Sequence, residues 1–347
     1  MPTPTRPRRR ARTRTLLATA LPLPLLAVVL AACTLDGGER LTIYSGRSQN
    51  LIEPLLVEFA DETGIDIDVR YGDSADLALL IDEEGDQTPA DLFLSQSPGA
   101  VGFLDEQGRL STLSESALDQ VEPANRSSDG TWLGLSGRVR VLVHNTDEVD
   151  PTDLPDSVLD LVDPAFEGEV AVAPSNASFQ DFVTAMRSER GDQATAEWLE
   201  GLADNGAQVY ANNTAIVEAV GRGEIAYGLV NHYYNHRARE EDPSVPSENH
   251  VFPDGDIGSL LIVSAAAIPA ASDRTDDAEA LLSYLLQEDA QRFYAEETFE
   301  YPLARGVAAP EGLPPLDELS VDTVDLDTLG GGLARTRELI EASGLER

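Results

Sequence analysis

The repeated order of short apolar strand, polar turn and amphipathic helix, which begins at Leu41, most constrains the fold of this chain. In the first unit, a helix predicted over 51–63 carries apolar residues at helical spacing and ends at Gly64. Because strands that alternate with helices usually pair in parallel, we expect an α/β protein. Further strands are predicted at 65–71, 91–94, 170–172, 208–210 and 224–230, and further helices at 99–107, 179–188, 214–220, 233–240, 278–287, 289–298 and 333–343.

Polar turns follow five of the predicted strands, at the points where helices begin. In open parallel sheets, ligands bind beyond the carboxyl ends of the strands. Helix N-termini at that edge offer free N–H groups and a positive dipole end, which suit anions. A pocket for a polar, anion-bearing ligand is therefore expected there, although such junctions occur in every α/β protein.

The N-terminal 33 residues have the pattern of an export signal. Six arginines precede the apolar run 16–30, which contains two prolines and is shorter than the ~20 apolar residues of a membrane-spanning helix. Cys33 is the only cysteine and stands where bacterial lipoproteins are cleaved and acylated, so we expect a lipid on Cys33 and a polar tether over 34–40. A buried thiol in an uncleaved anchor is the alternative. The export route, Sec or twin-arginine, stays open.

The residues after Cys33 are strongly acidic. They hold all 62 Asp and Glu residues but only 18 of the 24 basic residues, every one an arginine, which gives a formal charge of −44. Such a surface repels phosphate backbones and anionic lipid headgroups. We therefore expect no nucleic-acid partner, and we expect membrane attachment through the lipid anchor only.

The segment 227–237, YGLVNHYYNHR, carries the most specific chemistry. In the first turn of a helix, Tyr233 and Tyr234 lie ~100° apart and can both face a cleft, with Asn231 as a reasonable N-cap. Two phenol oxygens that converge on one point suit a hard, highly charged cation, and a bound metal deprotonates a ligand whose free pKa is ~10. Two aromatic residues that pack at an ordinary helix start are the alternative.

Two histidines in the same segment offer a second metal hypothesis. His232 and His236 are spaced i, i+4 and could bind zinc on one helix face. A zinc site needs three or four ligands, usually histidine or thiolate. No cysteine and no third histidine stands nearby in the sequence, so zinc is the weaker hypothesis.

Six stretches occur in the same order in a known family: LTIYSG (41–46), PADLFL (89–94), LSGRVRVLV (135–143), NASFQDFVTAMR (176–187), QVYANN (208–213) and NHYYNHR (231–237). On these stretches the chain resembles the ferric-ion-binding periplasmic proteins, which are type II solute-binding proteins of iron(III) ABC importers. The resemblance covers nearly all of 41–345, and the tyrosine doublet with its flanking asparagine and arginine is its most specific part. It implies a two-lobed type II periplasmic-binding-protein fold and Fe³⁺ as cargo.

The resemblance implies iron ligands, because the two tyrosines of that family map onto Tyr233 and Tyr234. Some members have a histidine where this chain has Ser48 and a glutamate where it has Gln96, so both positions offer only neutral oxygen donors here. Other members add a third tyrosine, at or beside Phe179. Gln96 and Ser48 are therefore further candidate ligands, and the remaining positions on the ion are left to an exogenous anion or chelator.

The resemblance also implies a synergistic anion, namely phosphate, carbonate or citrate. The family holds this anion with the turn before a helix, with two asparagines and, in some relatives, with an arginine. Helix capping is the alternative role for the two asparagines, and a solvated surface charge is the alternative for the arginine. The residues that match the family positions are Arg47, Asn176, Ala177, Ser178, Asn213 and Asn231.

Two longer extended stretches, 134–143 and 256–268, are interpreted as strands that cross between the implied lobes. Lobe 1 is expected over 41–137 and about 264–314, and lobe 2 over 138–263. Each lobe is expected to be a mixed, mostly parallel sheet flanked by helices. A C-terminal linker and helix, 315–347, is expected to pack on lobe 2.

Together these features predict an extracytoplasmic solute-binding lipoprotein on the outer face of the cytoplasmic membrane. It would be a monomer that captures ferric iron and delivers it to an ABC permease with its ATPase subunits. The alternative is a binding protein for another small polar solute, such as a phosphate ester, a carboxylate or a thiamine-like cation. A surface enzyme is a remote alternative, because the sequence after Cys33 has no cysteine nucleophile, no serine elbow motif and no histidine beside a candidate nucleophile.

Overall fold

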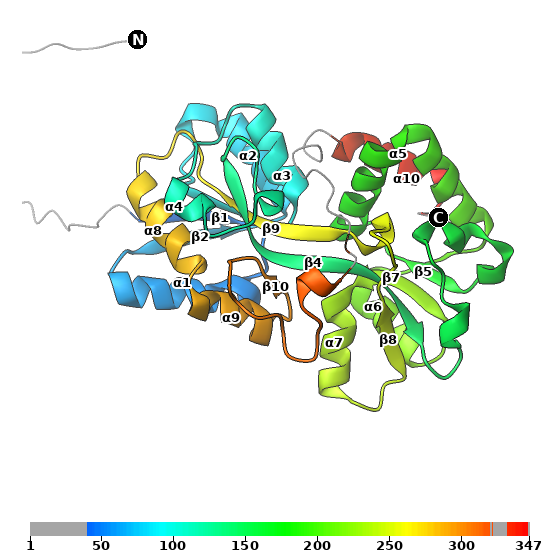
Figure 1. Cartoon of the computed structure of the whole chain (residues 1–347). Helices are drawn as coiled ribbons and strands as arrows, with labels where there is room; N and C mark the ends of the chain where they lie inside the picture. The colour runs from blue at the N-terminus through cyan, green and yellow to red at the C-terminus, as the bar shows by residue number, and fades with distance from the viewer. Residues whose placement is uncertain (1–39, 320, 322–331, 346–347) are drawn as a thin grey trace, which may run out of the picture. The chain divides into compact units, whose positions relative to one another are not determined.

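Figure 1 shows the computed structural model of the chain, which describes residues 40–319, 321 and 332–345. The predicted export signal, Cys33 and nearly all of the 34–40 tether lie outside the described residues. The strands are β1 (Leu41–Ser45), β2 (Ile67–Tyr71), β3 (Leu92–Ser95), β4 (Trp132–Asn145), β5 (Val170–Val172), β6 (Gln208–Val209), β7 (Tyr227–Asn231), β8 (Ser247–His250), β9 (Leu261–Ala267) and β10 (Tyr301–Pro302). The α-helices are α1 (Gln49–Thr63), α2 (Ser74–Glu84), α3 (Pro98–Glu106), α4 (Glu115–Leu118), α5 (Ala177–Asp204), α6 (Asn213–Gly221), α7 (His232–Glu241), α8 (Thr275–Leu285), α9 (Glu288–Glu297) and α10 (Leu333–Ser343).

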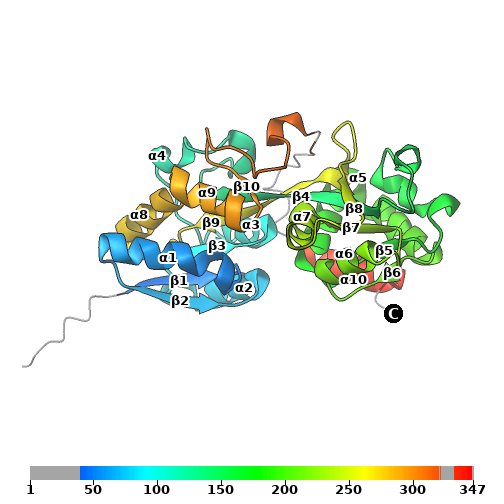
Figure 2. The same cartoon turned by 90° about the horizontal axis from the view of Figure 1, so that it is seen from below.

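The strands join into one sheet in the order β2-β1-β3-β9-β4-β7-β5-β6, with β8 and β10 paired to β4. Strands β1, β2 and β3 are parallel to one another, and so are β5, β6 and β7. The long strands β4 and β9 are antiparallel to each other and link the β1–β3 group to the β5–β7 group (Figures 1 and 2). The predicted α/β class is confirmed, and β4 and β9 fall where the sequence predicts the two crossing strands.

The helices follow the strands in a way that gathers their N-termini at one edge of the sheet. Helices α5, α6 and α7 come directly after β5, β6 and β7, which are parallel neighbours. The carboxyl ends of these three strands therefore meet, and each helix begins there. Helices α1, α2 and α3 flank the β1–β3 group in the same manner (Figure 2).

Two helices differ from the sequence prediction. Helix α2 was not predicted, although Asp73 caps its N-terminus by accepting a hydrogen bond from Ala75 N at 2.9 Å. Helix α5 continues to Asp204, well beyond the predicted end at 188. Gly191, at φ 82°, turns the chain inside α5, and the second part of the helix then buries Trp198. A glycine is needed at that position because residues with a side chain rarely adopt a positive φ.

Strand β4 is buried along its whole length. Helices cover a central strand on both faces, which explains a nearly continuous apolar sequence. Two arginines, Arg138 and Arg140, interrupt that apolar run. Because arginine is almost never fully buried without partners, these two positions direct attention to what surrounds them.

The C-terminal part of the chain returns to both groups of strands. Strand β10 pairs with β4 at Tyr301 and Gly137. Helix α10 packs on α5, where the hydroxyls of Thr184 and Thr336 lie 2.7 Å apart and Arg187 also donates to the backbone beside α10. Helix α10 thus contacts the 138–263 part of the chain. Within the part of the chain that the structure describes, we find no helix that combines the length and apolar character needed to cross a bilayer.

Candidate functional site

The two tyrosines of the doublet lie in the first turn of α7, directly after the carboxyl end of β7. The rings of Tyr233 and Tyr234 stack, with centroids 4.2 Å apart and an angle of 28° between their planes. Tyr233 is 7% exposed and Tyr234 is half-buried. The stacking keeps the two phenols side by side, as a shared ligand requires.

The surroundings of Tyr233 disfavour a phenolate in the absence of a cation. Burial raises the pKa of Tyr233 well above its ordinary value, and the neighbouring phenol of Tyr234 raises it further. Arg138 lies close enough to oppose this shift, and Glu300 adds to it. A bound cation would reverse the balance, because a metal stabilises the deprotonated form of its ligand.

Arg140, from β4, connects the N-terminal ends of the neighbouring helices. Its Nη1 donates to Asn231 Oδ1 at 3.2 Å and to Ser178 Oγ at 3.4 Å. The side chain of Asn213 donates to the same Ser178 Oγ at 3.5 Å. Arg140 Nε and Nη2 and Asn213 Oδ1 are buried and have no hydrogen-bond partner among the described residues. We call Arg140, Asn176, Ser178, Asn213 and Asn231 the anion pocket.

Helix capping, the alternative role for Asn213 and Asn231, is wrong for both. Asn231 precedes α7, but its side chain makes no capping hydrogen bond and instead accepts from Arg140. Asn212, not Asn213, caps α6 by accepting from the backbone N–H of Ala215 at 2.9 Å. The Asn231 side chain therefore contacts Arg140 and the Asn213 side chain contacts Ser178, and neither bonds to a helix end.

Asn176 caps helix α5 and also orients Ser178. Its Oδ1 accepts from Ser178 N at 3.1 Å and from Ser178 Oγ at 2.6 Å. The first-turn N–H groups of a helix have no intrahelical acceptor, so the start of α5 at Ala177 adds backbone donors on this side of the pocket. The NAS turn thus presents free N–H groups at the start of α5.

The electrostatics of the pocket favour an anion. Burial lowers the pKa of Arg140 to about 9, because its hydrogen-bond partners are neutral, and nearby Arg138 adds to this effect while Tyr234 opposes it. A buried cation with unpaired N–H groups is costly. An anion that accepted hydrogen bonds from Arg140 Nε and Nη2 would remove both costs at once.

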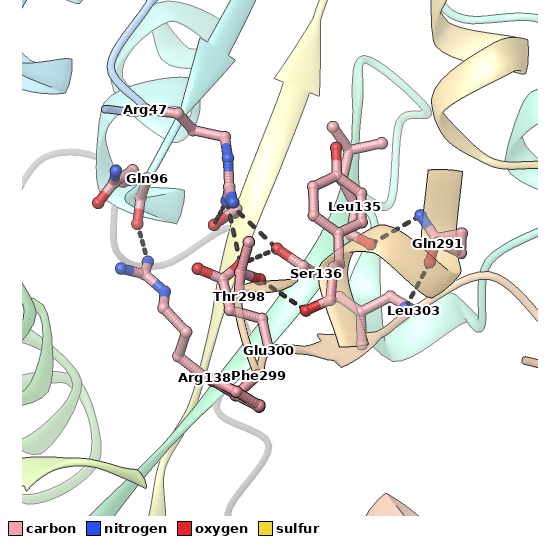
Figure 3. A network of polar contacts seen from close by, with 12 residues as sticks. Arg47, Gln96, Leu135, Ser136, Arg138, Gln291, Thr298, Phe299, Glu300 and Leu303 are labelled. Carbon is pink, nitrogen blue, oxygen red and sulfur yellow. Dashed lines mark hydrogen bonds and ion pairs between the residues drawn. The ribbon is translucent and has the colours of Figure 1, made fainter. Parts of the chain in front are cut away.

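A small cavity of about 110 Å³ lies between the start of α5 and the β1–β3 group. Gly46, Gln96 and Ser97 line it from one side and Ala177 and Asp181 from the other. Two hydrogen bonds cross between the groups beside it. Ser97 Oγ donates to Asp181 Oδ1 at 2.6 Å, and Arg138 Nη2 donates to the backbone oxygen of Gln96 (Figure 3).

Gln96 and Ser48, the two candidate neutral ligands, lie in different environments. Gln96 is half-buried and lines the cavity, whereas Ser48 is exposed at the start of α1. Asp181 is 7% exposed, and burial raises its pKa to about 6, although the hydrogen bond from Ser97 and the charge of Arg138 oppose that shift. Asp181 Oδ2 has no partner among the described residues.

Arg47 is 1% exposed, so the solvated-charge alternative for this residue is wrong. Its Nη1 donates to Glu300 Oε2 at 3.1 Å and to Ser264 Oγ at 2.7 Å (Figure 3). Ser136 also donates to Glu300. Although burial disfavours ionisation, Arg47 and Arg138 keep the pKa of Glu300 below its ordinary value. Unlike Arg140, Arg47 therefore already has a charged partner.

The contacts of Phe179 and His232 bear on two further hypotheses, the third phenol ligand and the zinc site. Phe179 is fully buried and packs on Phe182, with ring centroids 6.0 Å apart, so it replaces any third phenol with an apolar ring. His232 Nδ1 accepts from Val139 N at 3.1 Å, and Nε2 lies 2.8 Å from Phe299 O. Burial lowers the pKa of His232 to about 4. With both ring nitrogens engaged, His232 is not available to zinc, and the described residues contain no cluster of three or more His, Cys, Asp or Glu side chains that could hold a metal.

Sequence reasoning missed Arg138 and Arg140, two buried cations whose charges act on the tyrosines. A signal was present, because residues two apart on a strand share a face and both arginines stand in the apolar run VRVLV and its flank. Ser97, Asp181 and Glu300 were missed as well. No local pattern marks these three residues, since each acquires its partner from a distant part of the chain.

Several known proteins resemble this chain in sequence and in structure. The family of bacterial extracellular solute-binding proteins matches residues 87–324. An Fe(3+)-binding periplasmic protein of Serratia marcescens is 30% identical over 92% of this chain and 94% of its own length. Iron-bound HitA from Pseudomonas aeruginosa superposes with a TM-score of 0.81, at 31% identity, over 88% of this chain and 99% of that one. A Trichodesmium protein (IdiA, FutA) in complex with iron and citrate gives a TM-score of 0.78 at 26% identity, over 88% and 99% of the two chains.

Proposed function

The chain belongs to the bacterial extracellular solute-binding proteins, among the periplasmic ferric-iron-binding proteins, and we propose that it captures Fe³⁺ together with a small anion for delivery to an ABC permease. The observation that carries this proposal is the stacked pair Tyr233 and Tyr234 beside the anion pocket around Arg140. A pocket for a purely organic solute has no need of two converging phenols. An iron site with few protein anions, in contrast, needs both features.

The phenols supply the protein's anionic ligands. Hard trivalent iron prefers oxygen donors, and binding would convert both phenols into phenolates with release of their protons. The raised pKa of Tyr233 means that its phenol stays protonated until the ion arrives. Gln96 lines the adjacent cavity and could add a neutral oxygen from the β1–β3 group, whereas Ser48 would have to approach from the surface.

The charge balance of the site supports a doubly charged anion as the co-ligand. Two phenolates leave Fe³⁺ with one positive charge, and Arg138 and Arg140 add two more, which Asp181 offsets by one when ionised. The pair of Arg47 and Glu300 is neutral as a unit. Because buried charge must be compensated, a dianion such as carbonate or hydrogen phosphate, or a citrate that brings more than one carboxylate, fits best. The anion is therefore assigned to Arg140 rather than to Arg47.

Capture would proceed by closure of two lobes about β4 and β9. The lobes follow the β1–β3 group and the β5–β7 group, with the boundaries predicted from the sequence. The hydrogen bonds of Ser97 to Asp181 and of Arg138 to Gln96 cross between these groups, so they would form on closure and hold the site shut. The permease would then recognise the closed form.

The location and partners complete the proposal. Two or more acyl chains are needed for stable anchoring, and Cys33 as the lipid-bearing residue would place the protein on the outer face of the cytoplasmic membrane. The protein would act there as a monomer, with a permease and its ATPase subunits as partners. It would have no catalytic activity, since it releases its cargo unchanged.

Titration of the purified protein with ferric citrate, in the presence of a competing chelator, tests this function. We expect one iron per chain by metal analysis, a visible phenolate-to-iron absorption band, and release of about two protons per iron in calorimetry with buffers of different ionisation enthalpy. Because protons are released, the affinity for a fixed iron species should fall as the pH falls. Iron bound in several weak equivalents and without colour would instead indicate adventitious binding to the acidic surface.

Arg140→Gln is expected to separate stability from anion binding. Without an anion the variant should be at least as stable as the wild type, because it removes a buried cation that has only neutral partners. Its affinity for iron in phosphate or carbonate buffer should fall by about 10- to 100-fold, since hydrogen bonds to charged groups contribute about 1.5–3 kcal/mol. Arg109→Gln, whose ion pair with Asp82 lies at the surface, is the control and should change neither property. Unchanged anion dependence in Arg140→Gln would contradict the assignment.

A further inference from the structure

The turn formed by Thr298, Phe299 and Glu300 (labelled in Figure 3), which we call the Phe299 turn, joins α9 to β10. It contacts the tyrosine helix α7. His232 Nε2 lies 2.8 Å from Phe299 O, and Arg237 Nη2 donates to Thr298 O at 3.3 Å. The rings of His236 and Phe299 meet edge to face, with centroids 4.7 Å apart. His232, His236 and Arg237 of α7 thus all contact the Phe299 turn, although the turn lies more than 50 residues further along the chain.

His232 makes the central contact of this arrangement. Its Nδ1 accepts from the backbone N–H of Val139, in β4, at 3.1 Å. Because a backbone N–H can only donate, Nδ1 carries no proton, and Nε2 therefore carries the hydrogen and donates to Phe299 O. The ring also meets the edge of Tyr233, with centroids 5.9 Å apart, and lies 4.9 Å from the ring of Tyr301. One side chain thereby links the tyrosine helix, the crossing strand and the Phe299 turn.

The backbone of the Phe299 turn is strained where His232 binds it. Phe299 has φ 56°, in the left-handed region that a bulky side chain seldom adopts. Such strain costs on the order of 1–3 kcal/mol and persists only when surrounding contacts impose it. The next residue, Glu300, is held by Arg47 and Ser136, so the turn is anchored on both sides.

We propose that His232 is a positioning residue for iron binding, which fixes the phenols of Tyr233 and Tyr234 by fastening the start of α7 to the Phe299 turn. This inference rests on the proposed function. The turn follows α9 and precedes β10, whereas α7 belongs to the β5–β7 group, so the contact joins the two sides of the molecule at the tyrosines. A His232 that served only to fill the core would stabilise the fold without setting the ligand geometry.

Two substitutions separate the two hydrogen bonds of His232. In His232→Asn the side-chain oxygen can take the place of Nδ1 and accept from Val139 N, but the bond to Phe299 O is lost. In His232→Gln the longer amide can place its NH₂ near the position of Nε2 and donate to Phe299 O. We expect His232→Asn to shift the phenolate-to-iron band and to weaken iron binding by about 10- to 100-fold, the usual effect of losing a group that orients a metal ligand. We expect the iron affinity of His232→Gln to stay within about 3-fold of that of the wild type, because the hydrogen bond to Phe299 O is kept.

The outcomes are distinguishable when unfolding by urea is measured on the same samples. His232→Asn with wild-type affinity and band, or equal impairment of the two variants, would overturn the inference. If neither variant folds, His236→Ala, at a half-buried position whose ring contacts Phe299, takes their place, and an unshifted band there would overturn it. A wild-type protein that binds no iron would remove the proposed function and this inference together, whereas a wild type that binds normally isolates the role of His232.

Discussion

Replacing both Tyr233 and Tyr234 with phenylalanine is expected to abolish the visible iron colour and to weaken Fe³⁺ binding by roughly 1,000-fold or more, which corresponds to about 4 kcal/mol. The change removes the two oxygens that become phenolates while it keeps both stacked rings, so the packing of α7 should be preserved. The remaining donors of the site are neutral or belong to the exogenous anion. The measurement is a ferric citrate titration in competing chelator, followed by absorbance and metal analysis.

Tyr227→Phe is the matched control for the double variant. Tyr227 is 7% exposed, like Tyr233, and lies in the same strand-to-helix unit, but its ring packs on Phe166 with centroids 5.3 Å apart. It should leave colour and affinity unchanged. If the double variant kept its colour, or lost no more affinity than Tyr227→Phe, the phenols would not be the iron ligands.

Glu300→Gln is expected to lower the free energy of unfolding by about 3–5 kcal/mol, because it leaves the guanidinium of Arg47 buried without its charged partner. Both side chains are almost fully buried, at 1% and 3% exposure. The pKa of Glu300 is lowered in the folded chain, so the pair's contribution is complete above the unfolded pKa and is lost as the pH falls through the folded pKa. The difference between variant and wild type should therefore shrink in acid. Urea denaturation at neutral and acidic pH measures it.

Glu288→Gln provides the comparison for that stability effect. Glu288 pairs with Arg292 at 2.8 Å on the surface of α9, where both side chains are well exposed. Exposed ion pairs contribute about 0–1 kcal/mol, so this variant should unfold close to the wild type. Equal losses in the two variants would mean that the pair of Arg47 and Glu300 is no more important than a surface contact.

The fold was predictable where its signals are local. Gly64 ends α1 in the left-handed conformation, with φ 74°, as its position after an apolar helical pattern predicts. The signal of α2 was also present, since Asp73 stands at its cap and Leu77 and Ile81 are buried at helical spacing, yet it was not recognised. The extension of α5 past Gly191 depends on packing of its second part against the core, which no local pattern announces.

The site was predictable only in part. The tyrosine doublet and the three junctions that supply Asn176, Asn213 and Asn231 were visible as residues at strand ends. The choice between capping and ligand binding was not visible, because Asn212 and Asn213 are neighbours and only the path of the backbone decides which of them caps α6. The burial of Arg47 likewise depends on an acid that no sequence pattern links to it.

The amino-acid sequence alone determined the α/β alternation, the tyrosine pair at a helix start, the acidic surface and the position of the single cysteine, because each is a property of neighbouring residues. Only the tertiary structure decided which partners the buried arginines meet. Arg140 lies 91 positions before Asn231, and Arg47 lies 253 positions before Glu300. Such pairs are brought together by strand order and register, which depend on the packing of the whole sheet and not on any segment of it.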